Sequence, residues 1–293
     1  MSNVKKLIYY WLSQSVSSTA LAWLEQKQTE IAEGAPERIF FTAFSAVPRY
    51  LGKDNLQLTS QDLSKAEDLV PGWFPGDWTV DQAGRTFLLL ALPHDRSENY
   101  VRSLDKVFSS ADMRELVALY QSLPLLPHPE LHSQRAAEGI RSNMVNVFNA
   151  IALHNPYPAD YLDNIAWNQM VLKALFVGSP LHLIYGLDRR ANPELAKMLV
   201  NYAHERWAAK RPVSPELWRP VGKFADSEII ADLAKVLADG DIIEQQAAAL
   251  ACAESSLPAA QGLLSMYPDL KLAIQRGELT WSNFNRDRLP ICK

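Results

Sequence analysis

The stretch RAAEGIRSNMVNVFNAIALHNPYPADYLDNIAWNQMVLKALFV, residues 135–177, decides the fold. Its apolar residues recur at the three- and four-residue spacing of an α-helix, and the turn HNPYPAD at 154–160 divides it. A short connection of this kind places consecutive helices side by side and antiparallel. We therefore predict a helical hairpin made of helices 135–153 and 161–177.

The same pattern continues along the rest of the chain, where the alternation typical of strands is absent. The segments Asn192–Glu194 and Ser214–Glu216 each place a capping side chain before a proline, which is typical of a helix start. Several apolar helix ends run into a proline at irregular intervals. These features predict an all-α fold with no sheet, in the form of an irregular α-solenoid or helical-hairpin array of the HEAT type. We expect residues 1–225 to form one helical domain and residues 226–293 a C-terminal helical extension that packs on the same solenoid.

The composition of the chain indicates which partners and which cellular compartment to expect. The chain has 293 residues, of which 48% are hydrophobic, so it can bury a large core. Its formal net charge is −4, and because no basic excess favours phosphate binding we expect no nucleic-acid partner. The two cysteines, Cys252 and Cys292, make no disulfide framework, which fits a reducing cytoplasm. No apolar run reaches the roughly 18–20 residues of a spanning helix, and peripheral contact with the inner membrane through Leu7–Trp11 remains an alternative.

An aromatic segment interrupts the helical pattern. PGWFPGDWTVD, residues 71–81, combines turn-forming prolines and glycines with Trp73, Phe74 and Trp78. These rings either close the core under a loop or present a surface to a partner protein, because tryptophan is enriched where proteins bind one another. They are our candidate partner-binding residues.

The sequence lacks the motifs that are typical of catalytic and metal-binding sites. The sequence has no glycine-rich nucleotide loop, no HExxH and no paired CxxC. His128 and His132 have a four-residue spacing that suits a metal, but Pro129 between them indicates a helix start. His154, at a predicted helix end, suits either the capping of carbonyl groups or proton transfer. We therefore assign no catalytic residue, no metal ligand and no cofactor.

Polar side chains stand in unexpected places on both predicted helices. Helix 135–153 carries three asparagines, although asparagine is a poor helix former. Helix 161–177 has apolar residues all around its axis, which predicts burial on most sides, so its amides and its lysine need partners. These polar groups form either an interhelical ladder or a pocket between the two helices for a small polar or anionic molecule. The candidate ligand-binding residues are Arg135, Glu138, Arg141, Asn143, Asn146, Asn149, Asn168, Gln169 and Lys173.

Three segments carry a resemblance to a known family: RTFLLLALP at 85–93, residues 135–178, and GLDRRANPELAKMLVNYAHERWAAKRPVSPELWRPVG at 186–222. They resemble the EboA family, the metabolite-traffic proteins of bacterial Ebo gene clusters. The resemblance implies a place in a pathway that makes or moves a small metabolite. It also implies Ebo-cluster partners, which resemble a membrane prenyltransferase, a TatD-like hydrolase, a sugar-phosphate-cyclase-like enzyme and a xylose-isomerase-like protein. It carries no catalytic residue onto this chain.

Three hypotheses describe the function. The first is an accessory, non-catalytic cytoplasmic protein that binds a small polar metabolite or a pathway partner and promotes the metabolite's biosynthesis, trafficking or export. The second is an enzyme with a pocket between helices 135–153 and 161–177, in which His154 or Glu138 transfers a proton and an anionic substrate is held by Arg135, Arg141, Asn168 and Lys173. The third is a pure protein–protein scaffold that recognises its partner through residues 71–81.

Overall fold

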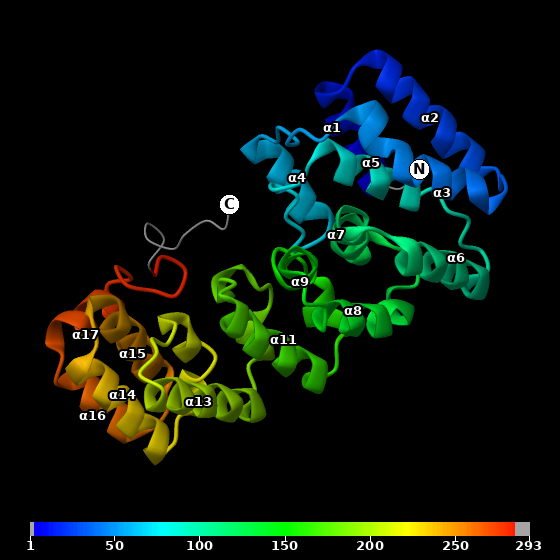
Figure 1. Cartoon of the computed structure of the whole chain (residues 1–293). Helices are drawn as coiled ribbons and strands as arrows, with labels where there is room; N and C mark the ends of the chain where they lie inside the picture. Colours follow the sequence, from blue (N-terminus) through cyan, green and yellow to red (C-terminus); the bar gives the residue numbers. More distant parts are fainter. Residues whose placement is uncertain (1–2, 285–293) are drawn as a thin grey trace. The chain divides into compact units, whose positions relative to one another are not determined.

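Helices build the part of the chain that the structure, a computed structural model, describes, which is residues 3–284 (Figure 1). No strand occurs in this range, where Asn55 and Thr79 form an isolated bridge. The predicted all-α fold is therefore confirmed, and the predicted solenoid stays a prediction. No helix within residues 3–284 is long and apolar enough to cross a membrane. Cys292 lies outside the described residues.

The chain divides into two compact units, Met1–Asp163 and Asn164–Lys293. This division falls inside the expected domain 1–225. The predicted boundary at residue 225 and the packing of residues 226–293 as a C-terminal extension stay predictions.

The first unit is built around its fifth helix. Its helices are α1 (Asn3–Ser15), α2 (Ser18–Ala32), α3 (Glu37–Leu51), α4 (Ser60–Leu69), α5 (Val80–Leu89), α6 (Ser97–Ser110), α7 (Met113–Gln121), η1 (Leu123–Leu125), η2 (Pro129–His132), α8 (Ser133–Ile140), α9 (Val145–Ala152) and α10 (Tyr157–Tyr161). Helix α5 packs against α1, α2, α3 and α7, and for this reason every residue from Ala83 to Leu89 is buried. The core of this unit therefore encloses α5 on all sides.

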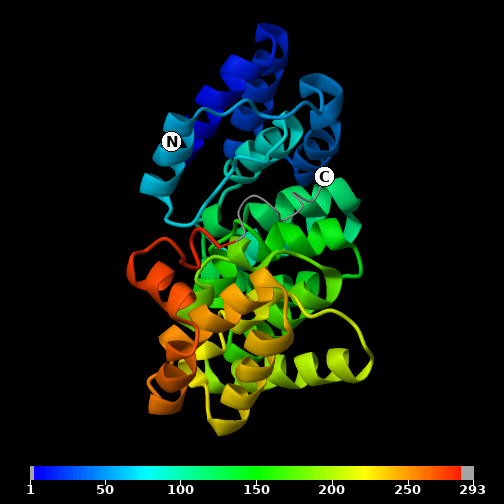
Figure 2. The same ribbon diagram turned by 90° about the vertical axis from the view of Figure 1, so that its left-hand side faces the viewer.

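The second unit gathers α14, α16 and α17 around α15 (Figures 1 and 2). Its helices are α11 (Asn164–Val177), η3 (Leu181–Leu183), α12 (Leu187–Arg190), α13 (Pro193–Ala208), η4 (Pro215–Trp218), η5 (Gly222–Phe224), α14 (Ser227–Asp239), α15 (Ile242–Glu254), α16 (Pro258–Ser265) and α17 (Pro268–Gln275). The α15 segment Ala247–Cys252 is entirely buried. Gly222 lies so close to this segment that an added Cβ would stand 2.6 Å from the Ala251 carbonyl oxygen. Small residues thus allow α15 and η5 to touch through their backbones.

The predicted helix 135–153 is broken into two. Helix α8 ends at Ile140 and α9 begins at Val145, with an extended backbone at Met144. The Ser142 hydroxyl oxygen accepts a hydrogen bond from the Met144 N–H at 3.1 Å, a local bond that competes with helix formation. The prediction of one continuous helix is therefore wrong. The break was missed because no proline marks it in the sequence.

The predicted helix 161–177 corresponds to α11, which begins at Asn164, and the turn before it forms the short helix α10. Burial of this helix on most sides is wrong. Although its apolar residues surround its axis, Ile165 is 72% and Phe176 is 78% exposed. Its buried residues are Trp167, Asn168, Met170, Val171, Ala174 and Leu175.

Both predicted helix starts are present, but the helices that they open differ in kind and in length. The Asn192 side chain accepts a hydrogen bond from the Leu195 N–H at 2.9 Å and caps α13, as predicted. The start at Pro215 opens only the 3₁₀-helix η4, and Ser214 makes no capping bond with its side chain. The proline signal therefore marks where a helix begins and leaves its length open.

Candidate functional site

Arg135, near the start of α8, is held by two carboxylates. Its Nε donates to Asp105 Oδ1 at 2.8 Å and its Nη1 donates to Glu138 Oε2 at 2.6 Å. Burial alone would lower the pKa of Arg135, but Asp105 and Glu138 raise it, and the net shift is upward. The structure thus brings two predicted residues, Arg135 and Glu138, together with Asp105, which sequence reasoning did not single out.

An open depression with a volume of about 580 Å³ lies beside this ion pair. Its size is that of small-molecule sites in proteins. One wall is the outer face of α6 and the other is η2, and the lining residues are Ser97, Glu98, Val101, Arg102, Asp105 and Leu131. Because Asp105 both lines the depression and binds Arg135, the predicted residues Arg135 and Glu138 support its rim.

Three histidines surround Tyr100 on the buried side of α6. The ring centroids of His94, His128 and His132 lie 6.3, 6.0 and 6.1 Å from that of Tyr100. Burial lowers the pKa of His132, whose Nε2 is 2.8 Å from the Pro127 carbonyl oxygen. Burial raises the pKa of Tyr100, whose hydroxyl has no hydrogen-bond partner within the described chain. These rings join η2 to α6 and so fix the two walls of the depression.

The predicted polar face of residues 141–149 is largely in water. Arg141, Asn143 and Asn146 are exposed at the break before α9 and on its first turn, and Asn149 is half-buried. The Asn146 amide nitrogen lies 3.6 Å from the Met113 sulfur of α7. Contact with water satisfies exposed amides without a buried network.

Asn168, the buried amide of α11, pairs with Asn192. The Asn168 amide donates to Asn192 Oδ1 at 3.1 Å, and the Asn192 amide donates to Asn168 Oδ1 at 2.9 Å. The partner that the sequence analysis required is therefore the N-cap of α13. Gln169 is exposed, and Lys173 is half-buried with its pKa lowered by burial. A ligand-binding role for these two residues stays a prediction.

Two rings of the aromatic segment 71–81 lie in the core. Trp73 is 2% and Trp78 is 5% exposed, and their ring centroids are 5.7 Å apart. Phe74 is partly exposed and stacks on the His154 ring, with centroids 4.4 Å apart. This burial favours the interpretation that the segment closes the core. Partner binding through these three residues stays a prediction, for which Phe74 is the most accessible.

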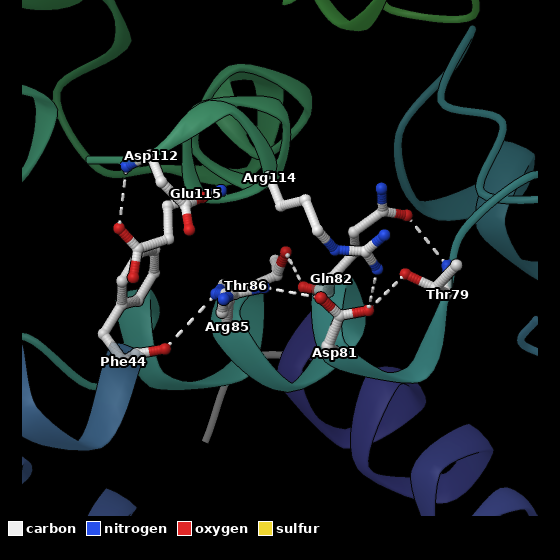
Figure 3. Close-up of polar contacts among 9 residues, drawn as sticks. All are labelled: Phe44, Thr79, Asp81, Gln82, Arg85, Thr86, Asp112, Arg114 and Glu115. Carbon is white, nitrogen blue, oxygen red and sulfur yellow. Dashed lines mark hydrogen bonds and ion pairs between the residues drawn. The ribbon is translucent and has the colours of Figure 1, made fainter. Parts of the chain in front are cut away.

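A buried ion cluster that sequence reasoning missed joins α5 to α7 (Figure 3). Asp81 is fully buried and accepts hydrogen bonds from Arg85 Nη1 at 2.6 Å, Arg114 Nη2 at 2.9 Å and the Thr79 hydroxyl at 2.6 Å. Burial alone would raise the pKa of Asp81, but these three donors lower it, and the net shift is downward. Two cations thus hold one carboxylate in its charged form.

Arg85 also compensates for a missing donor in α3. Pro48 lies inside that helix and has no N–H, so the Phe44 carbonyl loses its usual helical partner four residues on. Arg85 Nε donates to this carbonyl oxygen at 3.2 Å (Figure 3). Since Asp81 and Arg85 are 0% and 2% exposed, we assign this cluster to the stability of the core.

The comparison with known families agrees with the resemblance. The family described as "Metabolite traffic protein EboA" matches residues 4–222, which include the depression and Arg135. Comparison with the curated proteins and with the solved structures gives no match. Because the match covers well over half of the 293 residues, the chain belongs to the EboA family.

Proposed function

We propose that this protein is an accessory, non-catalytic factor of metabolite traffic that binds a small polar metabolite in the α6–η2 depression. Membership of the EboA family supports the role in metabolite traffic. The observation that carries the binding step is the depression itself, which combines a volume of about 580 Å³ with both charged and apolar lining residues. A cytoplasmic location, contact with the inner membrane and delivery of the metabolite to other Ebo-cluster proteins belong to the same proposal.

The ion pair between Arg135 and Asp105 gives the depression a fixed rim. Asp105 would otherwise be a mobile side chain on the surface of α6, with an exposed fraction of 46%. The Arg135 guanidinium contacts Asp105 and Glu138 and lies 5.5 Å from the centre of the Phe108 ring, which restricts its motion. A rim that is ordered before binding lowers the entropy cost of holding a ligand.

Filling the depression tests the proposal. The variant Val101→Phe adds a ring to its lining, and Val145→Phe, at a residue that is 44% exposed at the start of α9, is the matched control. Each full-length protein is purified from cells that carry the pathway and is then denatured, and the released compounds are measured by mass spectrometry. We expect the wild type and Val145→Phe to release the same compound, and Val101→Phe to release at least about tenfold less, which corresponds to roughly 1.4 kcal/mol of binding. An equal yield from Val101→Phe, or no compound from the wild type, would contradict the proposal.

A second candidate function is the binding of a helix from a partner protein on α11. Ile165, Gln169, Leu172 and Phe176 are spaced by four, three and four residues and therefore share one face of the helix. Ile165 is 72% and Phe176 is 78% exposed. Large apolar side chains that follow this spacing on a surface are typical of helix-to-helix recognition.

Removing the two exposed side chains tests the second candidate. We expect the double variant Ile165→Ser, Phe176→Ser to lose capture of co-expressed Ebo-cluster proteins by at least about tenfold, because two apolar anchors of the interface are gone. Its melting temperature should stay close to that of the wild type, since both side chains are already in water. The control is Met266→Ser, at a residue that is 74% exposed in the second unit. Unchanged capture by the double variant would exclude α11 as the binding face.

A further inference from the structure

We infer that the α6–η2 depression selects a zwitterion, a small molecule with a cationic amine at one end and a carboxylate or phosphate at the other. The inference rests on the proposed function and adds the chemical class of the ligand. It is carried by two opposite charges, Glu98 and Arg102, which line the depression from adjacent turns of α6.

The side chains of Glu98 and Arg102 form no hydrogen bond with the rest of the described chain. They are four residues apart with the acid first, which is the arrangement that most favours an ion pair within a helix. Both side chains are exposed, and within the described residues neither makes a salt bridge or a hydrogen bond. Each therefore presents a charge with free donors or acceptors at the depression.

The third charged residue of the lining, Asp105, and the nearby Glu37 already have partners. Asp105 accepts from Arg135 at 2.8 Å. Glu37, the carboxylate on the Arg102 side of α6, accepts from Lys106 at 2.6 Å and from Ser103 at 2.8 Å. These two donors, and to a smaller extent the charge of Arg102, lower the pKa of Glu37. Among the charged lining residues, Glu98 and Arg102 thus keep side chains without a hydrogen bond, and Arg102 acts on Glu37 only through its charge.

The short spacing of the two residues suits a short ligand. Residues four apart on a helix have Cβ atoms roughly 5–6 Å apart and their side chains lie on the same face, so a small molecule with a charge at each end can contact both. Val101 and Leu131 line the depression beside them, and Leu131 is 45% exposed. These apolar groups can contact a methylene chain between the two charges. A ligand with a single charge engages Glu98 or Arg102, but not both, and loses one charge-assisted contact.

Three probes of matched size separate the two contacts: γ-aminobutyrate carries both charges, butyrate only the acid and butylamine only the amine. Their affinities for the full-length protein are measured by calorimetry. We expect γ-aminobutyrate to bind at least about tenfold more tightly than either of the other probes, because it makes both contacts. Glu98→Gln should remove its advantage over butyrate, and Arg102→Gln should remove its advantage over butylamine. The control variants are Glu205→Gln and Arg211→Gln, at exposed positions outside the lining.

Each remaining outcome counts against the inference. It is overturned if a probe with one charge binds the wild type as tightly as γ-aminobutyrate, if none of the three probes binds, or if Glu98→Gln and Arg102→Gln leave the affinities unchanged. Failure of the proposed function has a different signature. A natural compound that is lost in Val101→Phe but carries a single charge would overturn the zwitterion and leave metabolite binding in place. Loss of no compound in Val101→Phe would overturn metabolite binding in the depression.

Discussion

Replacing Arg85 by methionine is expected to lower the free energy of unfolding by about 3–5 kcal/mol, the loss typical of breaking a buried ion pair by removing one partner. Arg85 is 2% exposed and supplies two hydrogen bonds, one to Asp81 Oδ2 at 2.6 Å and one to the Phe44 carbonyl at 3.2 Å. Methionine fills a similar length with apolar atoms but donates to neither oxygen. Urea denaturation followed by circular dichroism measures the change.

The control for this experiment is Arg114→Met. Arg114 also donates to Asp81, at 2.9 Å, but its side chain is 39% exposed, so water screens the interaction and can replace it. We expect a loss of about 1 kcal/mol. If Arg114→Met destabilises the protein as much as Arg85→Met does, the buried position of Arg85 is not the cause of its effect.

The variant Pro48→Ala tests why α3 depends on Arg85. Alanine restores an N–H that can donate to the Phe44 carbonyl within the helix. In the Arg85→Met background this bond replaces the one that was lost, and we expect Pro48→Ala to recover about 1 kcal/mol more than it adds to the wild type. Equal effects of Pro48→Ala in the two backgrounds would show that the proline and the arginine act independently.

Local chemistry explains which parts of the fold could be predicted from the sequence. The helical spacing predicted the class of fold, and Asn192 followed by Pro193 predicted the start of α13, because capping and the geometry of proline depend on a few adjacent residues. The break before α9 was missed because the apolar spacing runs through it, although the bond from the Met144 N–H to the Ser142 hydroxyl is itself local. The exposure of Ile165 was missed as well, because burial depends on which helices the tertiary fold places nearby.

The candidate site shows the same distinction. Arg135 and Glu138 were identified and lie together, because they are neighbours on one helix face. Asp105 was not identified, since it lies 30 positions from Arg135 and comes close only through tertiary packing. The Asp81–Arg85 pair did leave a signal, namely two opposite charges four residues apart within an apolar helix, which should prompt a search for a buried ion pair.

Glu216 holds together two elements of the second unit that are far apart in sequence. It is 4% exposed at η4, and its carboxylate accepts hydrogen bonds from the Leu181 N–H at 2.8 Å and the His182 N–H at 3.1 Å, while His182 Nδ1 lies 2.7 Å away. These two N–H groups belong to the first residues of η3, where no preceding helical turn supplies a carbonyl acceptor. A carboxylate is the acceptor that this end of a helix favours.

Glu216→Ala is therefore expected to lower the free energy of unfolding by about 2–4 kcal/mol, because it leaves two N–H groups unpaired beside the core. Glu216→Gln keeps one acceptor oxygen and should lose about half as much. Glu205→Ala, at an exposed position on α13, is the control and should stay within about 0.5 kcal/mol of the wild type.

Hydrogen exchange locates the effect of Glu216→Ala and separates it from a general loss of stability. The amides of Leu181 and His182 are protected in the wild type by their bonds to Glu216. We expect these two amides to exchange faster in Glu216→Ala even when urea is absent. In the wild type a hydrogen bond to the Glu216 carboxylate must break before exchange, and the variant lacks that bond. Protection of the Asn192-capped start of α13 should change less, since its bond to Leu195 does not involve Glu216. Exchange that rises equally across the second unit would mean that Glu216 stabilises the unit as a whole and that η3 has no particular dependence on it.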